Sequence, residues 1–204
     1  MPDCQRCPRL CASRTQIVLP TAPKIARGRL LCIGEAPGAD EDRVGSGFVG
    51  RAGKVLRQAL AQAGIDIAWQ VGFANVVRCR PPHNDRPTAA EIDACVPHLA
   101  QTIEALQPAA ILAASGTAAA IFFGKKSLAE LVVMEPSEAR AHKDAQAHAV
   151  LRPLPPVWRQ AFLRAVVPMP HTSGLAWNRP SPFPGKRWRD VGVDQIQKIL
   201  AHVG

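Results

Sequence analysis

The stretch Arg29-Leu30-Leu31-Cys32-Ile33, followed directly by the turn Gly34-Glu35-Ala36-Pro37-Gly38, decides the fold of this chain. A short apolar run that ends at a turn rich in glycine and proline is typical of a buried β-strand, here residues 29–33. Cys32 lies inside the run, so we expect its thiol to belong to the hydrophobic core.

Apolar strand patterns alternate with helical patterns along the rest of the chain. The capping box Thr88-Ala89-Ala90-Glu91 is the clearest start of a helix. Alternating strands and helices predict one domain over residues 1–204, with a three-layer α/β/α fold around a mainly parallel four-stranded sheet. Residues 125–155 are expected to be irregular, as a variable flap or a short hairpin. Further strands are predicted at 73–77, 109–114 and 165–168, and helices at 51–63, 88–106, 116–123, 157–164 and 191–203.

Three loops that follow predicted strands carry glycine, proline or histidine. They are residues 34–53, 78–87 and 169–183. Open parallel sheets bind ligands at the carboxyl ends of their strands. We therefore expect these three loops to converge on one site.

The composition indicates a polyanionic partner. The 204 residues contain 25 Lys and Arg against 16 Asp and Glu, a formal net charge of +9. Such an excess suits DNA or RNA through neutralisation of phosphates, although a basic but merely solvated surface has the same composition. Several arginines fall in predicted loops, which favours a binding groove over a basic tail: Arg78, Arg80, Arg86, Arg179, Arg187 and Arg189.

Nothing in the sequence indicates a membrane or an export signal. No apolar run approaches the roughly 20 residues that a membrane-spanning helix needs. The N-terminal residues MPDCQRCPRLCASR lack the apolar stretch of a signal peptide. We therefore expect a cytoplasmic protein and, since no pattern suggests assembly, a monomer.

Four cysteines are candidates for a metal or cluster site. Cys4 and Cys7 form a C-x2-C pair, Cys79 is expected to end a strand, and Cys95 lies in the capped helix. Four thiolates suit either zinc or a [4Fe–4S] cluster, and the spacing does not distinguish them. Cys11 is either a fifth candidate or a bystander, and unpaired reduced cysteines are the plain alternative.

Several motifs, in this order along the chain, resemble those of the family 4 (iron–sulfur) uracil-DNA glycosylases. The resemblance covers residues 4–200 except the 125–155 stretch. It implies hydrolysis of the N-glycosidic bond of uracil in DNA, which releases free uracil and leaves an abasic site. The motifs are Gly34–Gly38 (GEAPG), Gly45–Gly53 (GSGFVGRAG), Asn75–Pro82 (NVVRCRPP), Glu91–Pro97 and His171–Leu175 (HTSGL).

The same resemblance implies a [4Fe–4S] cluster held by Cys4, Cys7, Cys79 and Cys95. Its role would be structural: it would pin the N-terminus and the loop after Asn75 beside the DNA-binding face. No redox chemistry is expected in the cleavage step.

Three residues match the family's base pocket. Phe48 matches the ring that stacks on uracil, Asn75 the amide that reads it, and His171 the donor to uracil O2. A side-chain amide accepts from N3–H and donates to O4, whereas cytosine presents the reverse pattern. Each residue has a plain alternative: a core anchor for Phe48, a strand-end cap for Asn75 and a surface histidine for His171.

The first motif and the acidic run after it supply further candidates. The backbone of Gly34, Glu35 and Ala36 is expected to line the pocket, with the Glu35 carboxylate holding water or opposing the positive charge of the sugar. Glu41 matches the family position that crowds the 5-methyl group of thymine, unless it is simply a solvated acid. The best-known branch of the superfamily has an aspartate at the position of Ala36. Its absence implies a dissociative mechanism.

The DNA-binding candidates are Arg51, Ser173, Leu175 and Arg179. Leu175 is expected to wedge into the gap left by the flipped base, with Trp177 and Arg179 as possible helpers. Thr172 and Gly174 replace residues that are commonly proline, which predicts a looser segment. His83 is not at the offset of the histidine that traps DNA covalently in a related branch.

Two other functions remain open on the sequence alone. A non-enzymatic module that binds uracil- or abasic-DNA on the same fold agrees with Ala36 and Thr172. A zinc-stabilised nucleotide-processing enzyme agrees with the cysteine spacing.

Overall fold

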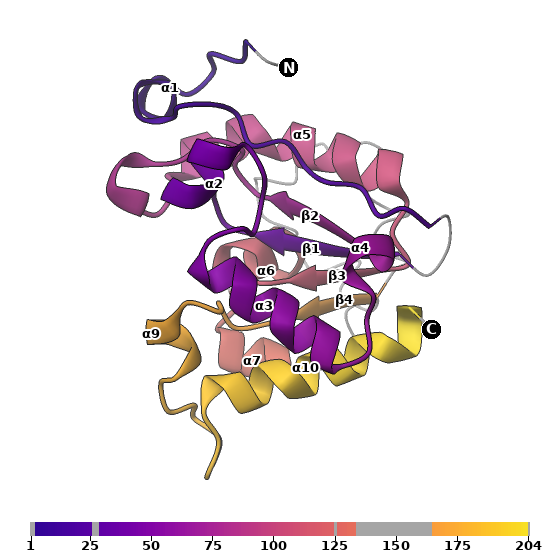
Figure 1. The fold of residues 1–204 in the computed structure, drawn as a ribbon. Helices are drawn as coiled ribbons and strands as arrows, with labels where there is room; N and C mark the ends of the chain where they lie inside the picture. The colour runs from indigo at the N-terminus through magenta and orange to yellow at the C-terminus, as the bar shows by residue number, and fades with distance from the viewer. Residues whose placement is uncertain (1–2, 26–28, 125, 134–164, 204) are drawn as a thin grey trace.

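The sheet consists of four parallel strands. The computed structural model describes residues 3–25, 29–124, 126–133 and 165–203 (Figure 1). The strand order is β2-β1-β3-β4, and the register places Gly34 beside Asn75 at the carboxyl edge. This confirms the predicted class of fold. The strands are β1 (Leu30–Gly34), β2 (Val71–Asn75), β3 (Ala110–Ala113) and β4 (Ala165–Pro168).

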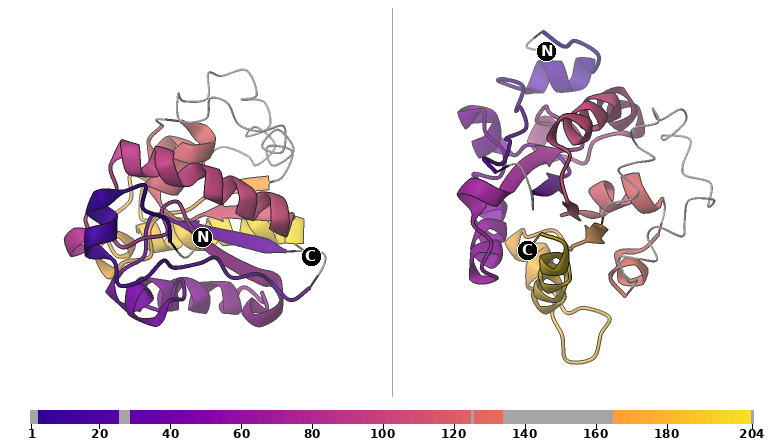
Figure 2. Two further views of the ribbon diagram at one scale, coloured as in Figure 1. Left: turned by 90° about the horizontal axis from the view of Figure 1, so that it is seen from above. Right: turned by 90° about the vertical axis from the view of Figure 1, so that its right-hand side faces the viewer.

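Helices cover both faces of the sheet, so the molecule has three layers (Figure 2). Side chains of β1 alternate between the two cores, as a pleated strand requires: Leu31 and Ile33 pack in one, Leu30 and Cys32 in the other. The first core is closed by α1 (Pro8–Ser13), α5 (Ala89–Leu106), α6 (Gly116–Phe123) and α7 (Leu128–Val132), and the second by α3 (Arg51–Gln62) and α10 (Trp188–Val203).

Short elements occupy the two ends of the strands. Figure 1 shows α2, α9 and the 3-10 turn η1 at the end where the strands finish, and α4 at the opposite end. Their bounds are α2 (Ala39–Val44), α4 (Ile67–Gln70), η1 (Pro82–Asn84) and α9 (Gly174–Trp177). No helix of the described residues is both long and apolar enough to cross a membrane.

The second strand lies two residues earlier than predicted. Val76 and Val77 are buried, which explains the apolar pattern, but their N–H groups donate to the carbonyls of Gly34 and Glu35, at 2.9 and 3.1 Å, beyond the end of β2. Cys79 therefore lies in the loop, not at a strand end. The last helix begins at Trp188 rather than 191.

The predicted irregular region 125–155 contains one helix that we did not expect. Ser127 caps it, because its hydroxyl accepts from the N–H of Glu130. Residues 134–155 and the predicted helix 157–164 lie outside the described residues.

The packing of α3 against the sheet gives a stability prediction. Leu56 is fully buried, whereas Gln58 of the same helix is exposed. We expect Leu56→Ala to lower the free energy of unfolding by about 2–5 kcal/mol, because it leaves a cavity in the core. Gln58→Ala should stay within about 0.5 kcal/mol of wild type. Urea unfolding followed by circular dichroism measures both; equal effects would contradict the assigned orientation of α3.

Candidate active site

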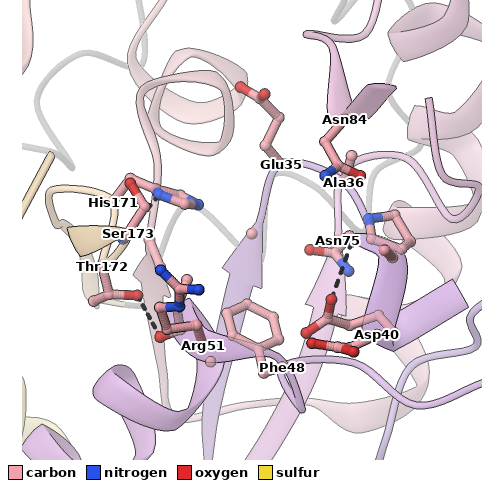
Figure 3. Close-up of a pocket in the computed structure, with 18 of the residues that line it drawn as sticks. Glu35, Ala36, Asp40, Phe48, Arg51, Asn75, Asn84, His171, Thr172 and Ser173 are labelled. Carbon is pink, nitrogen blue, oxygen red and sulfur yellow. Dashed lines mark hydrogen bonds between the residues drawn. The ribbon is translucent and has the colours of Figure 1, made fainter. Parts of the chain in front are cut away.

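A pocket of about 450 Å³ opens at the carboxyl ends of the strands (Figure 3). The three loops that we expected to converge all contribute to it. Its lining includes Gly34, Glu35, Ala36, Glu41, Phe48, Arg51, Asn75, Pro81, Asn84, Asp85, His171, Thr172 and Ser173.

Gly34 forms the floor of this pocket. A Cβ atom on Gly34 would lie 2.4 Å from the Asn75 side-chain oxygen and 2.8 Å from the tip of the Phe48 ring. Any larger residue would therefore displace both side chains. Asn75 is only 8% exposed, and its amide faces the pocket beside Phe48. The strand register thus brings the predicted base reader and the predicted stacking ring together.

Phe48 is held in an unusual backbone conformation. Its φ of +59° is left-handed, which is rare for a bulky residue and costs on the order of 1–3 kcal/mol. Surrounding contacts hold it there: the Arg57 guanidinium donates to the Phe48 carbonyl at 3.0 Å, and the Phe73 ring lies 5.0 Å away. Gly53 allows the close approach, since a Cβ there would lie 2.2 Å from the Phe48 carbonyl. The ring is therefore fixed before any ligand arrives.

The His171 imidazole is oriented by its own loop. The backbone N–H of Ser173 donates to His171 Nδ1 at 3.1 Å. Since Nδ1 accepts, the proton of the neutral ring belongs on Nε2. Desolvation lowers the pKa of His171, and the nearby Glu35 carboxylate raises it by a smaller amount. The site therefore favours a neutral imidazole with a free N–H donor.

The Glu35 carboxylate is turned away from Phe48 and Asn75 (Figure 3). It accepts a hydrogen bond from the Thr117 hydroxyl and lies 3.5 Å from Arg86 Nε. We did not predict either partner. Thr117 lies in the first turn of α6, which follows β3. The loop after the third predicted strand therefore also contributes to this site, although our prediction included only the loops at 34–53, 78–87 and 169–183.

Two acids of the 40–42 run hold loops in place. The Glu41 carboxylate accepts from the N–H groups of Gly38 and Gly50, at 3.1 and 2.6 Å, so it is not a freely solvated acid. Asp42 is 2% exposed and accepts from the N–H of Thr15. Neither role was predicted. Whether Glu41 also crowds thymine stays a prediction.

The segment after β4 is anchored rather than loose. Thr172 is buried, and its hydroxyl donates to the Ala52 carbonyl at 2.7 Å, so the expected loosening is wrong there. Leu175 is 83% exposed on α9, beside the pocket but not in its lining, and Arg179 is likewise exposed outside it. Trp177 packs against Gly192 of α10, so it is a packing residue and not a wedge.

Cys4, Cys7, Cys79 and Cys95 line one small second cavity. Cys11 is outside its lining, and Cys32 lies in the core as predicted. Burial raises the pKa of the Cys95 thiol to about 11, and it also raises the pKa values of Cys7 and Cys79. These thiols are therefore protonated at neutral pH unless a cation binds them.

Three arginines line the cysteine cavity: Arg6, Arg14 and Arg78. Arg14 donates to Cys79 Sγ at 3.0 Å and to the Cys4 carbonyl at 2.7 Å. Arg78 is buried and donates to the His98 carbonyl at 2.7 Å, so its predicted place in a DNA groove is wrong. Within the described residues, no three His, Cys, Asp or Glu side chains are grouped as ligands of a single metal ion.

The sequence matches a known family over most of its length. The family model described as the uracil DNA glycosylase superfamily matches residues 23–192. The chain belongs to the uracil DNA glycosylase superfamily. The predicted resemblance is thus confirmed.

Relatives named type-4 uracil-DNA glycosylase share 40–46% identity with this superfamily member. The protein of Pyrobaculum aerophilum is 46% identical over 41% of this chain and 42% of its own length. For Thermotoga maritima the identity is 41%, over 60% and 62%. For Archaeoglobus fulgidus it is 40%, over 48% of each. The chain thus spans about half the length of the relatives that it matches.

The arrangement of His171 in this glycosylase-superfamily pocket predicts its titration. We expect its pKa below the ordinary histidine value of about 6.5, with the proton of the neutral ring on Nε2. Glu35→Gln should lower that pKa further, because it removes the charge that favours the protonated ring. Asp194→Asn, on α10, should leave it unchanged. Imidazole nitrogen NMR across a pH series measures both; a pKa above 6.5 would contradict the assignment.

Proposed function

We propose that this chain is a uracil-DNA glycosylase: it hydrolyses the N-glycosidic bond of uracil in DNA, releasing free uracil and leaving an abasic site. The observation that carries the proposal is the joint placement of Phe48, Asn75 and His171 around the Gly34 floor. Base excision repair begins with this reaction.

Recognition uses the rigid part of the pocket. A base inside a duplex must first be extruded, at a cost of a few kcal/mol. The fixed Phe48 ring supplies a flat wall, and the Asn75 amide accepts from N3–H and donates to O4 of uracil. Because Asn75 is nearly buried, cytosine would leave polar groups unpaired without water to replace them.

Cleavage of the glycosidic bond depends on the His171 imidazole N–H, a hydrogen-bond donor that binds most strongly in the transition state. As C1′–N1 breaks, its electron pair leaves with uracil and negative charge develops on O2. The His171 Nε2–H stabilises that charge more than it stabilises the neutral base. A neutral imidazole needs no compensating anion, which fits its lowered pKa.

The Glu35 carboxylate is proposed to stabilise the positive charge that develops on the sugar. The sugar becomes an oxocarbenium cation, water attacks C1′, and the proton of that water passes to solvent. Ala36 offers no carboxylate to activate the water, so we propose that the cation forms first. The Glu35 carboxylate, held by Thr117 and Arg86, opposes its charge from the rim.

The DNA strand is proposed to lie across the pocket mouth. Arg51 and Ser173 line it, Arg179 lies just after α9, and the exposed Leu175 has the position expected of a side chain that fills the vacated stack. Unpaired cysteines agree with a reducing compartment, and we propose a cytoplasmic monomer.

We propose that the cysteine cavity holds a [4Fe–4S] cluster, because its lining brings together four thiols, the number of ligands that such a cluster takes. Arg14 and Arg78 offset the negative charge of four thiolates. When bound, the cluster would join the N-terminal segment to the loop that contains Cys79 and to α5. It would take no part in cleavage.

Single-turnover cleavage of a labelled oligonucleotide tests the activity. Wild type should remove the uracil from DNA that contains one uracil opposite G, one uracil opposite A, or one uracil in a single strand. Alkali then converts the abasic site into a strand break that is measured. His171→Ala should slow the step by about 10²–10³-fold, as for loss of one transition-state donor. Asn75→Ala should reduce cleavage strongly, whereas Lys24→Met, at the opposite edge of the sheet, should not.

The same assay separates the glycosylase from the binding module. Tight binding of uracil-DNA by folded, iron-loaded wild type without release of uracil would overturn the enzymatic proposal. A control glycosylase must cut the same substrate.

Metal analysis tests the cluster. We expect about four irons and four sulfides per chain, with broad visible absorption, in wild type and in Cys11→Ser. Cys7→Ser should lose both, because Cys7 lines the cavity and Cys11 does not. Stoichiometric zinc, or loss of iron only in Cys11→Ser, would contradict the assigned ligands.

A further inference from the structure

Helix α1 follows Cys7 and contains Cys11, and its Arg9 side chain reaches away from the cysteine cavity. Arg9 reaches α5, where Nε and Nη2 bind the two carboxylate oxygens of Glu91 at 2.9 and 2.8 Å. The Glu91 side chain is only 8% exposed. Such a two-point pair with a nearly buried carboxylate fixes the direction of the guanidinium.

The same guanidinium also contacts the loop that borders the pocket. Arg9 Nη2 donates to the Arg86 carbonyl at 3.4 Å, and Nη1 lies 3.8 Å from the Asp85 carboxylate. Asp85 lines the pocket. One side chain therefore ties α1, the start of α5 and residues 85–86 together.

Arg86 continues the connection to the reacting groups. While its carbonyl accepts from Arg9, its own Nε lies 3.3 Å from the Thr117 hydroxyl and 3.5 Å from the Glu35 carboxylate. The Arg86 side chain is 72% exposed, and within the described residues its guanidinium is held by Thr117 and Glu35. The position of its backbone thus decides whether it reaches Glu35.

We propose that Arg9 is a positioning residue for cleavage: it sets the 85–86 turn so that Arg86 holds the Glu35 carboxylate beside the pocket. The proposal rests on the proposed glycosylase function. Through these contacts, the segment that carries Cys7 and Cys11 would influence the cleavage rate by positioning Glu35, without any redox change. Lysine cannot replace Arg9, because an ammonium has no rigid fork to bind Glu91 and the Arg86 carbonyl at once.

A purely structural staple between α1 and α5 is the competing explanation. It predicts that loss of Arg9 lowers stability and cluster retention and leaves the chemical step of folded, loaded protein intact. The two explanations differ in whether the effect of Arg9 passes through Arg86.

The experiment is a double-mutant cycle on iron-loaded protein, with Arg9→Gln, Arg86→Gln, the combination, and Lys24→Met as a control for lost charge. Single-turnover rate and affinity for uracil-DNA are measured separately, with visible absorption checked in every variant. We expect Arg9→Gln to slow cleavage by about 10–100-fold, the scale of a misplaced reacting group, with little change in affinity. In the Arg86→Gln background, Arg9→Gln should add almost nothing.

Other outcomes overturn the proposal. An unchanged rate in Arg9→Gln, or effects of the two substitutions that multiply, would show that Arg9 does not act through Arg86. If Arg9→Gln loses its cluster, Glu91→Gln replaces it in the cycle, because glutamine keeps the helix cap but weakens the pair with Arg9.

Failure of the proposed function would be recognised separately, because wild type itself would not cleave. Amide hydrogen exchange then decides the positioning claim. Exchange in the peptide around residues 84–88 and at residue 35 should rise in Arg9→Gln and not in Lys24→Met. Unchanged exchange would overturn the claim.

Discussion

The close approach of Gly34 and Asn75 at the edge of the sheet is the constraint on which the site depends. Parallel pairing of β1 with β2 puts these residues side by side, and the missing Cβ of Gly34 leaves the space that the amide and the Phe48 ring share. A shift of either strand by one residue would turn the amide to the other face of the sheet. The pocket is thus a direct product of strand register, and the hydrophobic cores on both faces protect that register.

The electrostatics of the pocket divide between two sides. On one, a backbone N–H determines which nitrogen of His171 carries the proton, and desolvation keeps the ring neutral. On the other, the Glu35 carboxylate lies beside the Arg86 guanidinium and accepts from the Thr117 hydroxyl. In the proposed reaction, a leaving anion and a sugar cation would need such opposite surroundings close together. Ordinary loop contacts around one sheet edge are sufficient to create them.

Much of this arrangement was predictable from the sequence, and the exceptions have physical reasons. The periodicity of residues 51–63 and the capping box at Thr88 predicted α3 and α5 well, because local chemistry determines both. The end of β2 was misplaced, since buried Val76 and Val77 look like strand residues although their N–H groups bond across the turn.

The loop arginines were harder to place. Arg78, expected in a groove, lines the cysteine cavity, and Arg86 is paired with Glu35. Charge along a sequence indicates that a partner is anionic, but only the fold decides whether that partner is DNA or a carboxylate of the same chain. The left-handed backbone of Phe48 left no trace in the sequence either, because its neighbours impose it.

The N-terminal segment has a consequence for how the molecule is made. The Asp42 carboxylate accepts from Thr15, Thr21 pairs with Phe73, and Cys4 and Cys7 face Cys79 and Cys95. Residues 4–21 therefore bind to elements that are synthesised after them. The cysteine cavity cannot close until α5 has been synthesised, so the thiols of Cys4 and Cys7 stay accessible to solvent until then. Until the cavity closes, only a reducing environment protects these thiols from oxidation.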